Sequence, residues 1–291
     1  MAGPKQQGVL YVVATPIGNL EDMTHRAVRI LREADLIACE DTRQTQKLLD
    51  HYGIKKPTVS YHDHNEVERA QELLAKLEEG LTIAQVSDAG MPGISDPGYR
   101  VVTLALERGF TVVPIPGASS LTAALAASGL PTDAFEFRGF LPAKSGQRRT
   151  MLESLQGHAH TIVVYEAPHR IRETLEDIVE ILGPQTPVVI ARELTKIHEE
   201  FIRGRADQVL GILQERELKG EITLLIGKGK NDAPQGHLTG NVAARLKEIM
   251  AQQQIDEKAA LKLLAKEQGR SKSELYRELQ RVQTRGPKER K

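Results

Sequence analysis

Four short segments either are rich in glycine and proline or hold adjacent carboxylates, and these residue types suit ligand binding. They are residues 15–22 (TPIGNLED), 40–43 (EDTR), 87–98 (SDAGMPGISDPG) and 114–120 (PIPGASS). Glycine removes the side chain that would keep a ligand from the backbone, and a helix that starts after such a loop offers free amides. Neither a G-x-G-x-x-G fingerprint nor a P-loop is present, which disfavours NAD and ATP. The first segment could instead be a turn with a helix cap, and the second could equally be an N-capping cluster for the helix that follows.

Metal chemistry is not indicated by the residue pattern. His62, Asp63 and His64 have side chains that ligate metals, but no further ligand is placed with them. We therefore interpret this trio as a solvated turn and predict no metal site. The single cysteine, Cys39, excludes an internal disulfide and a cysteine-based metal cluster.

The elements that would position the four segments alternate between strands and helices. Short apolar runs predict strands at 9–14, 36–39, 81–86 and 111–115, and helical patterns fall at 27–32, 66–79 and 99–108. This alternation predicts a largely parallel sheet that is covered on both faces. Ligands bind beyond the carboxyl ends of such strands, where the four segments lie.

A second α/β unit follows. It opens with a helix of small residues at 119–127 and continues through strands at 135–138, 161–165, 188–191, 199–203 and 221–226. We expect an N-terminal α/β domain over residues 1–116 and a second α/β domain over residues 117–228.

The end of the chain differs in composition. Residues 229–240 are rich in Gly, Pro and Asn and predict a linker. Residues 241–291 predict helices at 242–250, 258–268 and 272–282, and hold 13 Lys and Arg against 7 Asp and Glu, which leaves 26 against 32 elsewhere. The last two helices and their short turn resemble a helix-turn-helix. A basic RNA-binding extension and a plain solvated pair of helices both fit this pattern.

The composition indicates a soluble globular protein. The chain has 291 residues, 40% of them hydrophobic and 27% charged, and no run of eighteen apolar residues. The apolar stretch 9–14 is too short for the core of a signal peptide. We expect a cytoplasmic protein with no membrane association.

Taken together, the motifs resemble one family over the whole chain. They are ATPIGNLEDMTHRA (14–27), CEDTRQTQKLL (39–49), VSDAGMPGISDPG (86–98), PIPGASSLTAALAASGL (114–130) and YEAPHR (165–170). The pattern is similar to that of the ribosomal RNA small subunit methyltransferase I family, within the tetrapyrrole-methylase superfamily. The resemblance implies the two-domain class III methyltransferase fold, here with an α-helical C-terminal extension, and S-adenosylmethionine bound between the domains.

The resemblance also implies a reaction, a partner and a cofactor site. The reaction is 2′-O-methylation of a cytidine in the decoding region of 16S rRNA, naked or in the small subunit, by a homodimer. The residues it implies for the cofactor are Pro16, Asp88, Ala89, Gly90, Ile94, Ser95, Ser119, Ser120, Tyr165 and Ala191. Ser87 departs from the pattern, because many relatives have glycine before the aspartate.

A ribose 2′-hydroxyl is a poor nucleophile near neutral pH, so a general base would add about 10² to 10⁴ in rate. We predict Glu166 and Asp88 as the catalytic residues, with Asp41, His169 and Glu193 as alternatives. A cap or a structural hydrogen bond is an equally good interpretation of each.

RNA recognition requires cations around the cleft. The side chains predicted to contact phosphates are Arg43, Arg138, Lys144, Arg148, Arg149, His169 and Arg170. Aromatic residues are only 4% with no tryptophan, so base stacking is expected to be minor.

Two other functions remain open at this point. A methylase of the same fold could act on a tetrapyrrole or another small molecule, since the fold does not choose the substrate. A nucleic-acid-binding protein without activity could use the helical tail alone, but the strand-end loops would then have no purpose. A test of cofactor binding would distinguish the nucleic-acid-binding protein from the two methylases. The methyl acceptor, RNA or a porphyrinoid, would distinguish the two methylases from each other.

Overall fold

The structure is a computed structural model that describes residues 8–228, 246–247, 249–251, 255–268 and 275. The chain divides into two compact units, residues 1–230 and 231–291. The first unit holds two five-stranded sheets, one in each half.

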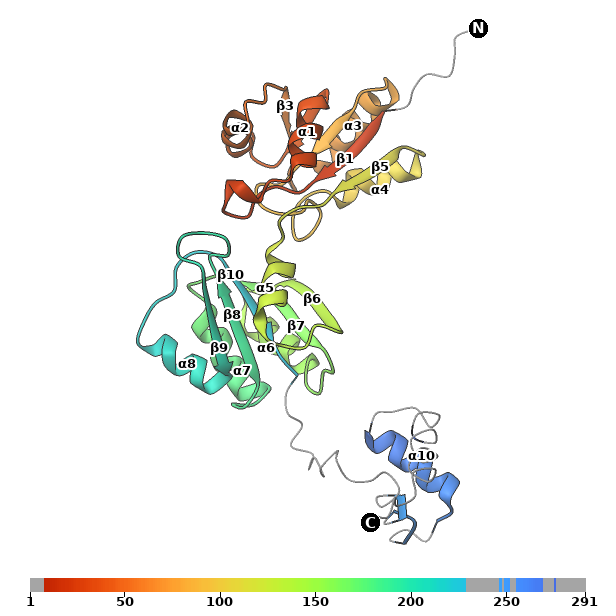
Figure 1. Ribbon diagram of the computed structural model, residues 1–291, viewed down its shortest axis with the longest axis vertical. Coiled ribbons are helices and arrows are strands. Elements are labelled where there is room, and N and C mark those ends of the chain that lie inside the picture. The colour runs from red at the N-terminus through yellow and green to blue at the C-terminus, as the bar shows by residue number, and fades with distance from the viewer. Residues whose placement is uncertain (1–7, 229–245, 248, 252–254, 269–274, 276–291) are drawn as a thin grey trace, which may run out of the picture. The chain divides into compact units, whose positions relative to one another are not determined.

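The first sheet has strands β1 (Val9–Val13), β2 (Leu36–Cys39), β3 (Thr58–Ser60), β4 (Ile83–Gln85) and β5 (Thr111–Ile115), in the order β3-β2-β4-β1-β5 (Figure 1). All of its strand pairs are parallel, as predicted. Strand β3 was missed, because its three half-buried residues at the sheet edge carry no apolar run. Since the strands are parallel, their carboxyl ends meet at one edge.

Helices cover both faces of this sheet. The helices are α1 (His25–Glu33), α2 (Thr42–His51), α3 (Glu66–Glu78) and α4 (Tyr99–Glu107), with a short 3-10 turn η1 (Leu20–Asp22) before α1. Apolar residues of α1 and α2 pack on one face, and those of α3 and α4 pack on the other. The strands are therefore buried on both sides, which is why they read as continuous apolar runs.

The second half is mixed α/β. It contains α5 (Ser120–Ser128), β6 (Phe135–Phe140), α6 (Ser145–Ser154), β7 (Thr161–Glu166), α7 (Ile171–Ile181), β8 (Pro187–Arg192), β9 (Glu200–Arg205), α8 (Ala206–Gln214) and β10 (Ile222–Ile226). The sheet order is β6-β7-β10-β8-β9, and only β6 and β7 are parallel. Helices α6, α7 and α8 share one core with the sheet. Helix α5 packs on the other face, in a cluster that also contains Ile17 from the first half.

In the second unit, helix α10 (Glu257–Gln268) confirms the predicted helix at 258–268. Its buried side chains cluster with Leu246, Ile249 and Leu275. The predicted linker 229–240 and the turn before the last predicted helix lie outside the described residues. Within the described part of the chain, no helix is long and apolar enough to cross a membrane.

Candidate active site

The loops that follow β1 and β4 are held together by backbone hydrogen bonds. The Thr15 amide donates to the Gly90 carbonyl at 2.9 Å, and the Gly90 amide donates back at 3.1 Å. The Thr15 hydroxyl donates to the Ser87 carbonyl at 3.0 Å. Gly90 has a φ of +83°, a conformation that favours glycine. This pairing fixes the segments 15–22 and 87–98 relative to each other.

A first cavity of about 350 Å³ lies beside this pair of loops. It brings together eight of the ten residues that were expected to bind a cofactor: Ala89, Gly90, Ile94, Ser95, Ser119, Ser120, Tyr165 and Ala191. They come from the loop after β4, the start of α5, and strands β7 and β8. Its volume lies in the range of small-ligand sites.

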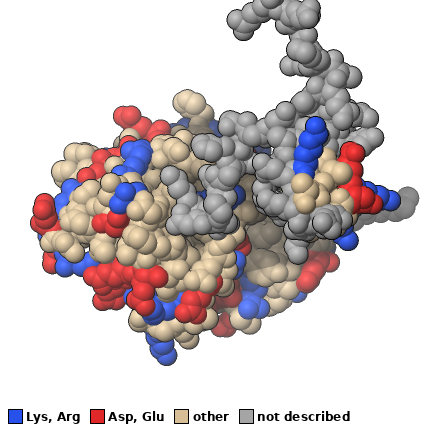
Figure 2. All heavy atoms as spheres, turned by 90° about the horizontal axis from the view of Figure 1, so that it is seen from below, with Lys and Arg blue, Asp and Glu red and all other residues tan. Residues whose placement is uncertain are grey.

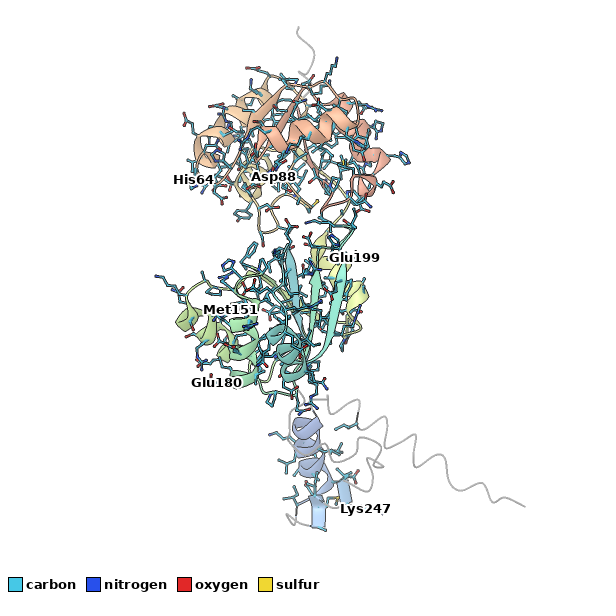
Figure 3. The ribbon with its side chains drawn as sticks, turned by 90° about the vertical axis from the view of Figure 1, so that its left-hand side faces the viewer. His64, Asp88, Met151, Glu180, Glu199 and Lys247 are labelled. Atoms are coloured by element: carbon cyan, nitrogen blue, oxygen red, sulfur yellow. The ribbon has the colours of Figure 1, made fainter. Side chains whose placement is uncertain are left out.

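Pro16 and Asp88, the other two expected cofactor residues, line a second cavity of about 490 Å³. Figure 3 shows Asp88 at the edge of the first half where the parallel strands end. The two cavities share Ile17, Ala89 and Glu221 as walls. The predicted set is therefore divided between two adjoining spaces.

The amino end of helix α5 gives the first cavity an anion-binding element. Ser119 is the N-cap residue of α5, yet its side chain makes no capping hydrogen bond. Its hydroxyl and the free amides of the first turn are available to a carboxylate. The carboxylates of Asp96 and Glu221, which line the same cavity, suit a ligand that also carries positive charge.

Tyr165 closes the cavity from strand β7. Its hydroxyl accepts a hydrogen bond from Ser120 at 3.0 Å, and its ring lies edge-on to Phe137 and tilted against Phe140. Burial raises the pKa of Tyr165 above its ordinary value, so the phenol is neutral at physiological pH. Its ring and hydroxyl therefore present an uncharged wall to a ligand.

Part of the wall, contributed by β10 and the residues just before it, was not predicted from the sequence. Gly220, Ile222 and Thr223 line the first cavity. Thr223 pairs with Tyr165 of β7 on one side and with Ala191 of β8 on the other. Sheet register alone brings Thr223 to the site, and no local motif marks it.

Glu166 does not fit the role of general base. Its side chain is fully buried. One carboxylate oxygen accepts from the Ala167 amide at 2.7 Å and pairs with Arg170 at 2.6 Å, while the other accepts from the Thr174 hydroxyl at 2.6 Å. Both oxygens are thus engaged in holding the turn that begins α7.

The alternatives Asp41 and Glu193 are engaged as well. Asp41 caps helix α2, and hydrogen bonds from Arg43 lower its pKa to about 2. Lys196 donates to Glu193 at 2.8 Å and holds the pKa of that carboxyl below its usual value. Carboxylates stabilised in the ionised form are weak bases.

Unlike Asp41 and Glu193, Asp96 has a raised pKa, which suits a general base. It lies on the loop after β4, is half-buried, and lines the first cavity. Burial raises the pKa of Asp96 to about 6, and repulsion by Glu40, Asp88 and Asp63 adds to the shift while a hydrogen bond from Ser87 opposes it. The segment 87–98 contained this signal, since Asp96 is its second carboxylate.

Arg148 corrects the predicted set of RNA contacts. It is only 2% exposed, and its guanidinium pairs with Asp177 at 2.7 Å and Glu173 at 3.4 Å. A cation enclosed in this way cannot reach a phosphate. Arg148 instead joins α6 to α7.

The other predicted contacts are accessible to different degrees. Ion pairs occupy Arg43, Arg138, Arg149 and Arg170. Lys144 and His169 are exposed and have no ion-pair partner within the described residues. On the face shown in Figure 2, acidic and basic side chains are interspersed.

The family model described as tetrapyrrole (corrin/porphyrin) methylases matches residues 9–210, so the fold is that of a tetrapyrrole methylase. The chain is similar to a ribosomal RNA small subunit methyltransferase I from Halalkalibacterium halodurans, with 52% identity over 79% of each chain. A protein of the same description from Synechocystis is 48% identical over 92% of this chain and 96% of its own length. The chain therefore belongs to the ribosomal RNA small subunit methyltransferase I family.

A solved structure of similar fold is uroporphyrin-III C-methyltransferase from Thermus thermophilus, complexed with S-adenosyl homocysteine. It has a TM-score of 0.52 at 20% identity and covers 76% of this chain and 97% of its own. At this level of identity the likeness shows the fold alone, and it confirms the predicted two-sheet α/β architecture.

Substitution of Glu166 tests its structural role. We expect Glu166→Gln to lower the free energy of unfolding by about 3 kcal/mol, because it leaves Arg170 without its buried partner. Glu176→Gln, an exposed residue of α7, is the control, with an expected change below about 0.5 kcal/mol. Denaturant unfolding measures both. A Glu166→Gln protein of unchanged stability but with methyl transfer reduced a thousandfold would instead make Glu166 the base.

Proposed function

We propose that the protein is an S-adenosylmethionine-dependent methyltransferase that methylates the ribose 2′-hydroxyl of a cytidine in the decoding region of 16S rRNA. The observation that carries this proposal is the first cavity, where eight expected cofactor residues meet. The relatives that share about half of this sequence are described as methyltransferases of small-subunit ribosomal RNA. At this identity the same reaction is the natural assignment.

The residues of the first cavity fit the cofactor. When bound, S-adenosylmethionine supplies a methyl group on a positively charged sulfur. Ser119 and the amino end of α5 would hold its carboxylate, and Asp96 and Glu221 give the cavity the negative charge that a sulfonium compound favours. The uroporphyrin methylase of similar fold was solved with S-adenosyl homocysteine, which supports the assignment.

Asp96 would accept the proton of the 2′-hydroxyl. A general base works best when its pKa lies near the pH of the reaction, and burial places the pKa of Asp96 at about 6. Asp96 is therefore ionised at pH 7 to 8 yet retains basicity. The remaining contribution of the chain is to hold the hydroxyl in line, about 3 Å from the carbon it attacks.

Contacts with the RNA would involve cations outside the first cavity. Phosphates of the RNA would contact Lys144, His169 and the predicted basic extension 241–291. The cleft would lie between the two predicted α/β domains, residues 1–116 and 117–228.

A homodimer would cover Ile94 and Phe140, which are 44% and 60% exposed at the first cavity. A sedimentation mass of one chain would exclude the dimer. An enzyme with small-subunit RNA as its substrate would act in the bacterial cytoplasm.

The assay is methyl transfer from radiolabelled S-adenosylmethionine to purified small ribosomal subunits, to free 16S rRNA and to a porphyrinoid. We expect one labelled ribose in the decoding region, because the relatives are described as acting on small-subunit RNA. Nuclease mapping locates the label. Label in the porphyrinoid, with none in RNA, would replace this proposal with a small-molecule methylase.

The raised pKa of Asp96 would make the reaction depend on pH. We expect Asp96→Asn to lower kcat about 10² to 10⁴-fold, and kcat/KM of the wild type to fall as the pH drops through about 6, where Asp96 is protonated. Because the pKa of Asp96 is higher in the folded protein than its ordinary value of 3.8, its ionisation opposes folding at neutral pH. Asp96→Asn should therefore not lower the free energy of unfolding at pH 8.

Asp63→Asn is the matched control. Asp63 is exposed and does not line the first cavity, but its charge contributes to the raised pKa of Asp96. This variant should keep its kcat, and the midpoint of its pH profile should shift to lower pH. If Asp96→Asn instead weakens cofactor binding and leaves kcat unchanged, Asp96 is a cofactor ligand and not the base.

A further inference from the structure

The residues proposed above to hold the cofactor line the first cavity, which leaves the second cavity for another ligand. Its walls combine apolar residues of the loop after β1 with polar residues of helix α2 and the loop after β4. Its polar residues include Gln44, Lys47, Asp88, Lys196 and Glu221. At about 490 Å³ it is wide enough for one nucleotide, and it adjoins the first cavity across Ile17 and Ala89.

Lys47 is the available cation in this cavity. Lys196 also lines it, but pairs with Glu193 at 2.8 Å and with Glu221 at 3.1 Å. Lys47 donates to the neutral side-chain oxygen of Gln44 at 2.9 Å and has no carboxylate partner within the described residues. Its charge is therefore uncompensated, which suits a phosphate.

Gln44 and Asp88 offer opposite hydrogen-bonding groups to the same space. The amide oxygen of Gln44 accepts from Lys47, so its amide nitrogen is left to donate. One oxygen of Asp88 accepts from the Asp41 amide at 3.1 Å, and its other oxygen is left to accept. Cytosine presents an amino donor beside two acceptors, whereas uracil presents a carbonyl acceptor and a ring donor. A donor and an acceptor on the wall therefore fit the edge of either pyrimidine.

We propose that the second cavity is the acceptor pocket, which binds the ribonucleotide to be methylated with its phosphate against Lys47 and its base edge against Gln44 and Asp88. This inference rests on the proposed function. The nucleotide must leave its stack to enter, as in other enzymes that act on single nucleotides of a folded nucleic acid. Its ribose then lies at the boundary with the first cavity, near Ile17 and Ala89.

Lys47→Gln in the full chain tests the phosphate contact. We expect KM for small ribosomal subunits to rise about tenfold, and the slope of log affinity against log salt to fall by about one, because one phosphate contact is lost. The Kd for S-adenosyl homocysteine, measured by calorimetry, should stay within twofold. Gln46→Ala is the control, since Gln46 is exposed on the same helix and binds Asp50 outside the cavity. It should leave KM and the salt slope unchanged.

Gln44→Ala tests the base contact against the same control. We expect KM for small ribosomal subunits to rise on the order of tenfold in Gln44→Ala, because one hydrogen bond to the base is lost, and to stay unchanged in Gln46→Ala. Weaker binding of S-adenosyl homocysteine in either Lys47→Gln or Gln44→Ala would overturn the inference and assign the second cavity to the cofactor. Variants that match Gln46→Ala in every measurement would also overturn it. Absence of methyl transfer in the wild type is a separate result, which refutes the proposed function itself.

Discussion

The site depends on the parallel pairing of the first sheet, because this pairing places the carboxyl ends of all five strands at one edge of the sheet. The segments after β1, β2, β4 and β5 therefore meet in space although they are spread over about a hundred residues. The reciprocal hydrogen bonds between Thr15 and Gly90 then fix two of these segments against each other. The amino end of α5 and strands β7, β8 and β10 complete the enclosure from the second half.

Two carboxylates at this edge destabilise the folded protein when they are ionised. Burial and repulsion raise the pKa of both Glu40 and Asp96, so each opposes folding when it ionises. Arrangements of this kind are characteristic of functional sites, where a group is held in an unfavourable state for use in chemistry. The carboxylates of Asp41, Glu166 and Glu193 contrast with them, because each is stabilised by a cation and serves the fold.

Local sequence patterns predicted the features that depend on residues close together in the sequence. The strands of the first sheet, its helices and most of the first cavity followed from apolar runs, glycine-rich loops and the family resemblance. Side chains that depend on tertiary packing were not predictable in this way. Arg148 resembles its neighbour Arg149 in the sequence, but one is enclosed by α7 and the other reaches the surface. Thr223 joins the site only through strand register, and Asp96 differs from Asp88 by its burial.

The central claim is that the first cavity holds the cofactor while the second stays free for the acceptor. A crystal structure of the full chain with S-adenosyl homocysteine tests it most directly. We predict ligand density bounded by Ser119, Tyr165 and Ala191, with the space beside Lys47 and Gln44 left open. Density that fills the second cavity, or that lies away from the edge of the first sheet, would contradict the account.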